Sequence, residues 1–156
     1  MNKKRIIIVP LTILVLIGCA NKQDGNDSKI ALMKKTDPPP IELVDNPETD
    51  SYGHAIKREI SKMKELYDVA VIQGKEETLV VYKVKHLQRF HMKKIEKKMD
   101  RYLEDKYPDE DFILSSDYKI FLETIRLKEK LKKGSIPKKD AEKKFQDIVK
   151  LQKEKT

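Results

Sequence analysis

Apolar and polar residues alternate in blocks along the chain, and the spacing within each block predicts its local structure. From residue 55 to residue 67, apolar positions recur every three or four residues, as in an amphipathic helix; they are Ile56, Ile60, Met63 and Tyr67. Two short runs rich in β-branched residues follow, DVAVIQ (68–73) and TLVVYKV (78–84), and the Gly-bearing segment GKEE separates them. We expect these two runs to pair as a β-hairpin.

A second helical pattern extends from about Phe90 to Tyr107. Its apolar face consists of Ile95, Met99, Tyr102 and Leu103. Pro108 follows, and we expect the helix to end there because proline lacks the backbone N–H that a helix interior needs. The next apolar run, FILS (112–115), predicts a third strand.

Two more helices are expected after this strand. Asp117 is suited to cap a helix from Tyr118 to about Lys133, and Gly134 is suited to end it in a left-handed conformation. Ser135 and Pro137 are expected to form the cap and opening turn of the last helix. The residues that face inward in the last helix are expected to be Ala141, Phe145, Ile148 and either Val149 or Gln152.

The order of these elements is helix, strand, strand, helix, strand, helix, helix. It predicts a small α+β domain of two layers, in which a three-stranded sheet, the hairpin plus one strand, is backed by helices on one face. The third strand follows a helix, so a parallel pairing with one member of the hairpin through a right-handed crossover is compatible with the order.

The first residues form a different pattern. Lys3, Lys4 and Arg5 precede an apolar run from Ile6 to Ile17, and the chain becomes polar after Cys19. A basic start, a short apolar run and small residues at the end are typical of a secretory signal peptide. Twelve residues are also fewer than the roughly 20 that a membrane-spanning helix needs.

The tetrapeptide Leu16-Ile17-Gly18-Cys19 resembles the bacterial lipobox. The resemblance implies that a diacylglyceryl group joins the Cys19 sulfur and that cleavage between Gly18 and Cys19 removes residues 1–18. The amine freed on Cys19 is then open to a further acyl chain. A chance cysteine at the end of a buried helix is the alternative, but it explains neither the basic start nor the polar stretch that follows. Cys19 is the single cysteine, so its lipidation excludes a disulfide or a catalytic thiol.

Residues 19–53 then form the lipidated N-terminus and a flexible linker, rich in Asn, Asp, Lys, Ser and Pro. The short apolar patches Ile30–Met33 and Ile41–Val44 in this stretch are interpreted as incidental. The α+β domain covers residues 54–134, and residues 135–156 form a C-terminal amphipathic helix.

Three stretches resemble the YhcN/YlaJ-type sporulation lipoproteins of endospore-forming bacteria. They are the lipobox, DVAVIQGKEETLVVYKV, and IEKKMDRYLEDKYPDEDFILSSDYKIFLE. The likeness covers about Ile56 to Gly134. It implies a lipid-anchored protein at the outer face of the cell or spore membrane, with a part in sporulation, the spore envelope or germination and without a defined chemistry.

Charge adds one candidate surface. Charged residues make up 38% of the chain, and its formal net charge is +8. Five cations crowd the second helix; they are Lys93, Lys94, Lys97, Lys98 and Arg101. An anionic membrane leaflet suits such a face, and a merely solvated face is the alternative. A basic binder of anionic polymer is a weaker reading, and nucleic acid is disfavoured because an exported protein rarely meets it.

Candidate chemistry is sparse. Neither the histidines, His54, His86 and His91, nor other residues show the spacing of a metal site, and we expect no metal, cofactor or small-molecule substrate. Acidic residues gather around Pro108, and Glu104 with Asp117 is the pair that a cell-wall hydrolase would need within about 5 to 10 Å. The preferred prediction is a non-enzymatic interaction module, anchored in the membrane through Cys19, with protein partners at the spore membrane. A wall hydrolase, or an accessory to one, is the alternative.

Overall fold

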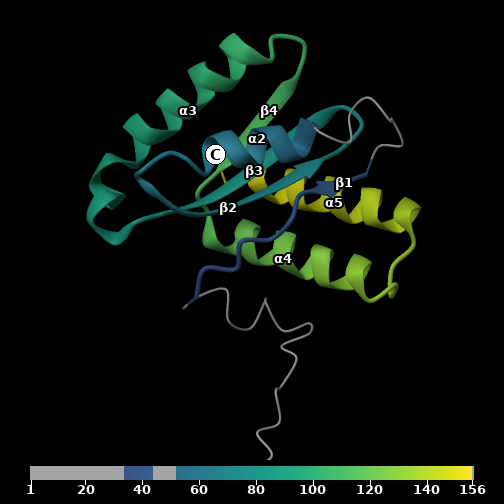
Figure 1. Cartoon of the computed structure of the whole chain (residues 1–156). Coiled ribbons are helices and arrows are strands. Elements are labelled where there is room, and N and C mark those ends of the chain that lie inside the picture. Colours follow the sequence, from purple (N-terminus) through teal and green to yellow (C-terminus); the bar gives the residue numbers. More distant parts are fainter. Residues whose placement is uncertain (1–33, 44–51, 156) are drawn as a thin grey trace, which may run out of the picture.

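The structure, a computed structural model, describes residues 34–43 and 52–155. Its sheet has four strands in the order β1-β2-β3-β4, shown in Figure 1. They are β1 (Ile41–Glu42), β2 (Leu66–Gln73), β3 (Glu77–Val84) and β4 (Asp111–Ser115). The antiparallel β2–β3 hairpin confirms the predicted hairpin, and β4 pairs with β3 in parallel. The prediction of three strands is wrong, because β1 adds a fourth, parallel to β2.

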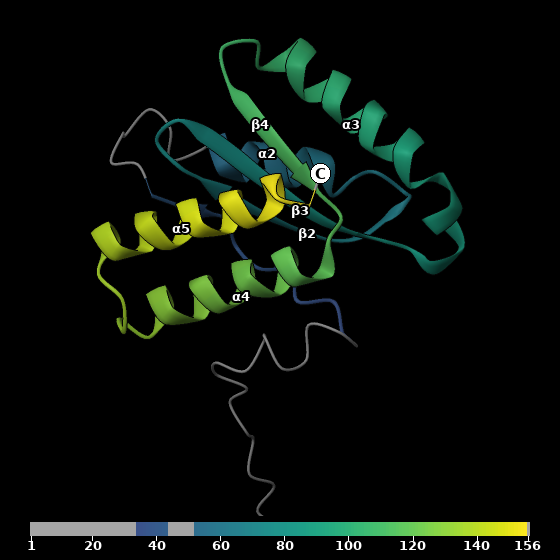
Figure 2. The ribbon, with the colours of Figure 1, turned by 180° about the vertical axis from the view of Figure 1, so that it is seen from behind.

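Helices cover both faces of this sheet. Helices α2 (Tyr52–Ile60) and α3 (Met92–Lys106) lie on one face, and α4 (Tyr118–Lys132) and α5 (Lys138–Lys153) lie side by side on the other (Figures 1 and 2). A 3-10 turn, η1 (His86–His91), precedes α3. The predicted two-layer arrangement is therefore corrected to three layers.

The central strands explain the third layer, because their side chains are apolar on both faces. Val69, Val71, Val80 and Tyr82 pack toward α2 and α3, whereas Ala70, Ile72, Leu79 and Val81 pack toward α4 and α5. Strands buried on both faces are continuous apolar runs and do not alternate with polar residues. The largely apolar runs DVAVIQ and TLVVYKV therefore indicate strands that are buried on both faces.

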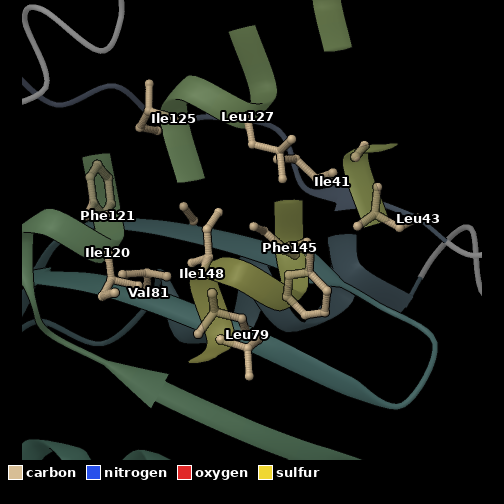
Figure 3. Packing of buried hydrophobic residues seen from close by; sticks show 14 residues of the cluster. Ile41, Leu43, Leu79, Val81, Ile120, Phe121, Ile125, Leu127, Phe145 and Ile148 are labelled. Atoms are coloured by element: carbon tan, nitrogen blue, oxygen red, sulfur yellow. The ribbon is translucent and has the colours of Figure 1, made fainter. Parts of the chain in front are cut away.

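The core beneath α4 and α5 is shown in Figure 3, where Phe145 and Ile148 of α5 lie among side chains of α4 and β3. A Cβ added to Gly74, at the hairpin turn, would lie 2.2 Å from a ring carbon of Phe145. Helix α5 therefore packs in the same core as the sheet, although the sequence placed residues 135–156 outside the domain.

Strand β1 lies inside the stretch predicted as linker. Ile41 and Leu43 are 6% and 4% exposed and belong to the core (Figure 3). The backbone N–H of Leu43 donates to the Gln73 carbonyl at 2.9 Å. These apolar residues are not incidental, because they cover an edge of the sheet that would otherwise be open.

Local boundaries agree with the predictions in part. The Asp117 carboxylate accepts from the Ile120 N–H at 3.1 Å, and Gly134 has φ +62°, so the predicted cap and left-handed stop of α4 are confirmed. Helix α2 ends at Ile60, and Tyr67 lies in β2. The Ser135 hydroxyl donates to the Lys130 carbonyl at 3.1 Å, so its predicted role as a cap of the last helix is wrong.

In the parts of the chain that the structure describes, none of the helices is both long and apolar enough to cross a bilayer.

Candidate functional site

The predicted lipidation site Cys19 and the cleavage position Gly18 lie outside the described residues. The remaining predicted site residues all lie on α3 and are exposed; they are Lys93, Lys94, Lys97, Lys98 and Arg101. Ile95, Met99 and Leu103 are buried on the opposite side of the helix.

The five cations share one face. Successive residues of an α-helix are offset by about 100°, which places these five within an arc of about 140°. Lys98 forms an ion pair with Glu65 at 3.1 Å. Glu104 and Asp105 occupy the same side of α3 in its last turns, so the face is basic over most of its length and acidic at its C-terminal end. We call the part from Lys93 to Arg101 the basic face.

The 3-10 turn η1 continues the basic face with two exposed apolar side chains. Leu87 is 81% exposed and Phe90 is 94% exposed. Residues three apart eclipse each other in a 3-10 helix, so the two side chains are on the same side of the turn. Sequence reasoning missed this pair, since it took Phe90 as the start of a helix. The available signal was two bulky apolar residues inside a run that otherwise holds Lys, Arg, His and Gln.

A pocket of about 620 Å³ adjoins η1 at the ends of β3 and β4. Its polar lining consists of Tyr67, Lys83, Lys85, His86, Arg89, Ser116 and Tyr118. Lys83 pairs with the buried Asp68 at 3.3 Å and lies 4.9 Å from the centre of the Tyr67 ring. Burial lowers the pKa of Lys83, although Asp68 acts in the opposite direction.

Tyr118, which also lines this pocket, has a buried side-chain oxygen. This hydroxyl oxygen finds no hydrogen-bond partner among the described residues. Burial raises the pKa of Tyr118, so the hydroxyl keeps its proton and can donate a hydrogen bond. The exposed cations Lys85 and Arg89 make this pocket suited to an anionic group.

A second hollow, of about 710 Å³, lies between the end of α2 and α3. Glu59 lines it and accepts hydrogen bonds from Tyr102 at 2.9 Å and Tyr107 at 3.3 Å, and it also pairs with Lys106. The Lys106 ammonium is the main reason why the pKa of Glu59 is lowered. Because these groups bond to one another, they hold α2 against α3.

The acid pair required by the hydrolase alternative is not brought together. Glu104 lines a hollow of about 330 Å³ with Glu110 and Asp111, at the start of β4. Asp117 follows the other end of that strand, where its carboxylate bonds to Lys155 at 2.6 Å. Burial, and then the charges of Asp109 and Asp111, raise the pKa of Glu110.

The histidines are also dispersed. His54 is exposed on α2, and His86 and His91 stand at the two ends of η1. Within residues 34–43 and 52–155, no group of three or more His, Cys, Asp or Glu side chains is placed to hold a metal ion.

Comparison of the chain with protein-family models, curated proteins and solved structures finds no match. The resemblance to sporulation lipoproteins therefore depends on the three stretches of sequence alone.

Proposed function

We propose that this protein is a lipid-anchored interaction module on the outer face of a bacterial membrane. The observation that carries the proposal is the sequence Leu16-Ile17-Gly18-Cys19 directly after a basic start and a short apolar run. Two acyl chains give stable membrane anchoring where one is marginal. The resemblance to sporulation lipoproteins supports a position at the cell or spore membrane and a role in sporulation, the spore envelope or germination.

The geometry of the head supports an interaction role in two respects. Both faces of the sheet are covered by helices, so a partner meets helix surfaces or the outer strand β4 and not a sheet face. The acidic side chains Glu59 and Asp117 form hydrogen bonds and ion pairs within the head. Such groups fix structure, whereas a catalytic acid must be able to reach a substrate.

Replacement of Cys19 by Ala tests the anchor. We expect the variant to lose acyl labelling with a radioactive or clickable fatty acid, and to be secreted or to keep its signal peptide. The neighbouring variant Asn21→Ala is the matched control and should be labelled and cleaved normally. Mass spectrometry that finds a free Cys19 thiol on an uncleaved wild-type chain would contradict the proposal. Crosslinking of the anchored protein in its native membrane then identifies its protein partners.

A further inference from the structure

We propose that η1 and the N-terminal part of the basic face of α3, from Lys93 to Lys97, dock the head onto an anionic phospholipid bilayer. In this arrangement Leu87 and Phe90 insert at the boundary between headgroups and acyl chains, and the surrounding cations lie near the lipid phosphates. The inference depends on the proposed function, because the lipid on Cys19 is what brings the head close to a bilayer.

The first argument is the exposure of the apolar pair. Among the residues that the structure describes, Phe90 at 94% and Leu87 at 81% are far more exposed than the other two exposed large hydrophobic side chains, Tyr67 at 39% and Tyr102 at 41%. Both side chains are on one short turn that connects β3 to α3. An aromatic and a leucine on one side of a basic amphipathic segment are the usual composition of a surface that lies in the membrane interface.

The second argument is charge complementarity. Lys85 precedes the apolar pair, Arg89 lies between its two members, and Lys93, Lys94 and Lys97 follow it on α3. Each Lys or Arg close to an anionic leaflet strengthens binding about fivefold. The pocket that adjoins η1 presents Lys85 and Arg89 to the same region, where a lipid phosphate is a suitable anion.

Glu96 and the acidic end of α3 do not oppose an orientation in which η1 and the first turns of α3 face the lipid. Glu96 accepts a hydrogen bond from the Tyr82 hydroxyl at 3.0 Å. Glu104 lies about 16 Å from Lys93 along the helix axis, at 1.5 Å per residue. Salt screens charges over about 8 to 10 Å. With η1 toward the lipid, the acidic end of α3 therefore points away from the bilayer and contributes little repulsion.

The third argument is the position at which the tether reaches the head. The first described residue, Lys34, accepts a hydrogen bond at its carbonyl from Lys83 at 3.2 Å, and Lys83 lines the same pocket as η1. The described chain therefore begins near the end of the central strands from which η1 projects (Figure 1). Fifteen residue steps separate Lys34 from Cys19, a span of at most about 50 Å. The anchored lipid and η1 are thus within reach of the same patch of membrane.

The absence of tryptophan from the sequence allows a direct test. Phe90→Trp introduces the only tryptophan of the protein at the tip of η1. The lipidated mature variant is placed in vesicles of phosphatidylcholine with phosphatidylglycerol, and brominated acyl chains serve as the quencher. We expect a shift of the emission to shorter wavelength and strong quenching. Gln146→Trp, at an exposed position on α5, is the matched control and should show neither.

A charge variant tests the second argument in the same Phe90→Trp background. Lys93→Glu with Lys97→Glu should weaken docking of the anchored head about thirtyfold or more, since two favourable charges are lost. The exposed pair Lys139→Glu with Lys143→Glu on α5 makes the same change in net charge and should leave docking unchanged. Vesicles of phosphatidylcholine alone should abolish the quenching.

The remaining outcomes of these vesicle experiments contradict either the docking proposal or the proposed function. Equal quenching of the Phe90→Trp and Gln146→Trp proteins, or equal quenching in neutral and anionic vesicles, would overturn the docking proposal. A shift in neutral vesicles that grows with protein density would mean that a second copy covers η1, and would also overturn it. If the chain does not float with vesicles because Cys19 carries no lipid, the proposed function fails. If it floats and residue 90 stays in water, only the docking inference fails.

Discussion

Asp68 shows how much a single residue contributes to holding the N-terminal segment. Its side chain is fully buried, a costly position for a carboxylate unless its oxygens are satisfied. Here they accept from the N–H groups of Thr36 at 2.7 Å, Asp37 at 3.1 Å and Val69 at 3.0 Å, and they pair with Lys83. Thirty-two positions separate Thr36 from Asp68, so this one carboxylate joins two distant parts of the chain.

Replacing Asp68 by Ala should lower the free energy of unfolding by about 3 kcal/mol, because backbone donors and a half-buried lysine lose their partner together. Urea unfolding measures this loss, and amide exchange should accelerate selectively at Thr36 and Asp37. Thr36→Val removes only the hydroxyl that donates to Asp68 at 2.9 Å, and should cost about 1 kcal/mol. Equal effects of the two substitutions would show that the carboxylate does not anchor the segment.

At the scale of the secondary-structure element, residues close in sequence determine where α4 begins and ends. Asp117 caps its first turn and Gly134 ends it, and the sequence predicted both because each depends only on residues within a few positions. The end of α2 was not predictable in this way. Met63 and Tyr67 continue its helical spacing, but Leu66 pairs with Val84 in the hairpin, and this pairing begins β2 before another helical turn can form.

The Asp117 cap makes the stability of α4 depend on pH. Burial raises the pKa of Asp117, but hydrogen bonds from Lys155 and from the N–H groups of Ile120 and Lys119 outweigh it, so the pKa falls below its ordinary value of 3.8. A lowered pKa in the folded state means that the ionised form adds stability above about pH 4. This stability disappears as the pH falls through the folded-state value.

Asp117→Asn keeps a capping oxygen and removes the charge. At neutral pH we expect the wild type to be more stable by about 0.5 to 1 kcal/mol, a modest value because the ion pair is partly exposed. The difference should shrink as the pH falls below about 4, as urea unfolding at neutral and acidic pH will measure. When Lys155 is also replaced by Gln, the effect of Asp117→Asn on the free energy of unfolding at neutral pH should become smaller. A difference that persists in acid would mean that the charge of Asp117 is not its source.

At the scale of the whole molecule, sequence reasoning recovered the hairpin, α3, β4 and α4, since each has its own periodicity. It missed the third layer, although the unbroken apolar runs of β2 and β3 indicated burial on both faces. It also missed β1, because two residues have no periodicity and their place depends on pairing with Ile72 and Gln73, far away in sequence.

Sequence reasoning also predicted one part of the candidate site and missed another. The five cations of the basic face were predicted from helical spacing, and all are exposed. The exposure of Leu87 and Phe90 was not predicted, because it results from a 3-10 turn that replaces the first turn of the expected helix. Helix propensity alone does not distinguish the 3-10 turn from the first turn of an α-helix, because the same residues can form either one.

The segment from Lys34 to Leu43 is therefore part of the folded head, and removing it tests where the head begins. A chain that starts at Lys34 should unfold with the free energy of the mature protein. A chain that starts at Tyr52 loses the burial of Ile41 and Leu43, each worth about 1.5 to 3 kcal/mol, and leaves Asp68 without its donors from Thr36 and Asp37.

We expect the shorter chain to be less stable by at least about 4 kcal/mol in urea unfolding, a large part of the total stability of a small domain. A synthetic peptide of residues 34–43, added in excess, should restore part of the loss, whereas the same peptide with Ile41→Asp should not. Equal stability of the two chains would place the boundary of the head after Leu43. The first ten described residues would then be tether, and the lipid on Cys19 would hold the head from a more distant point.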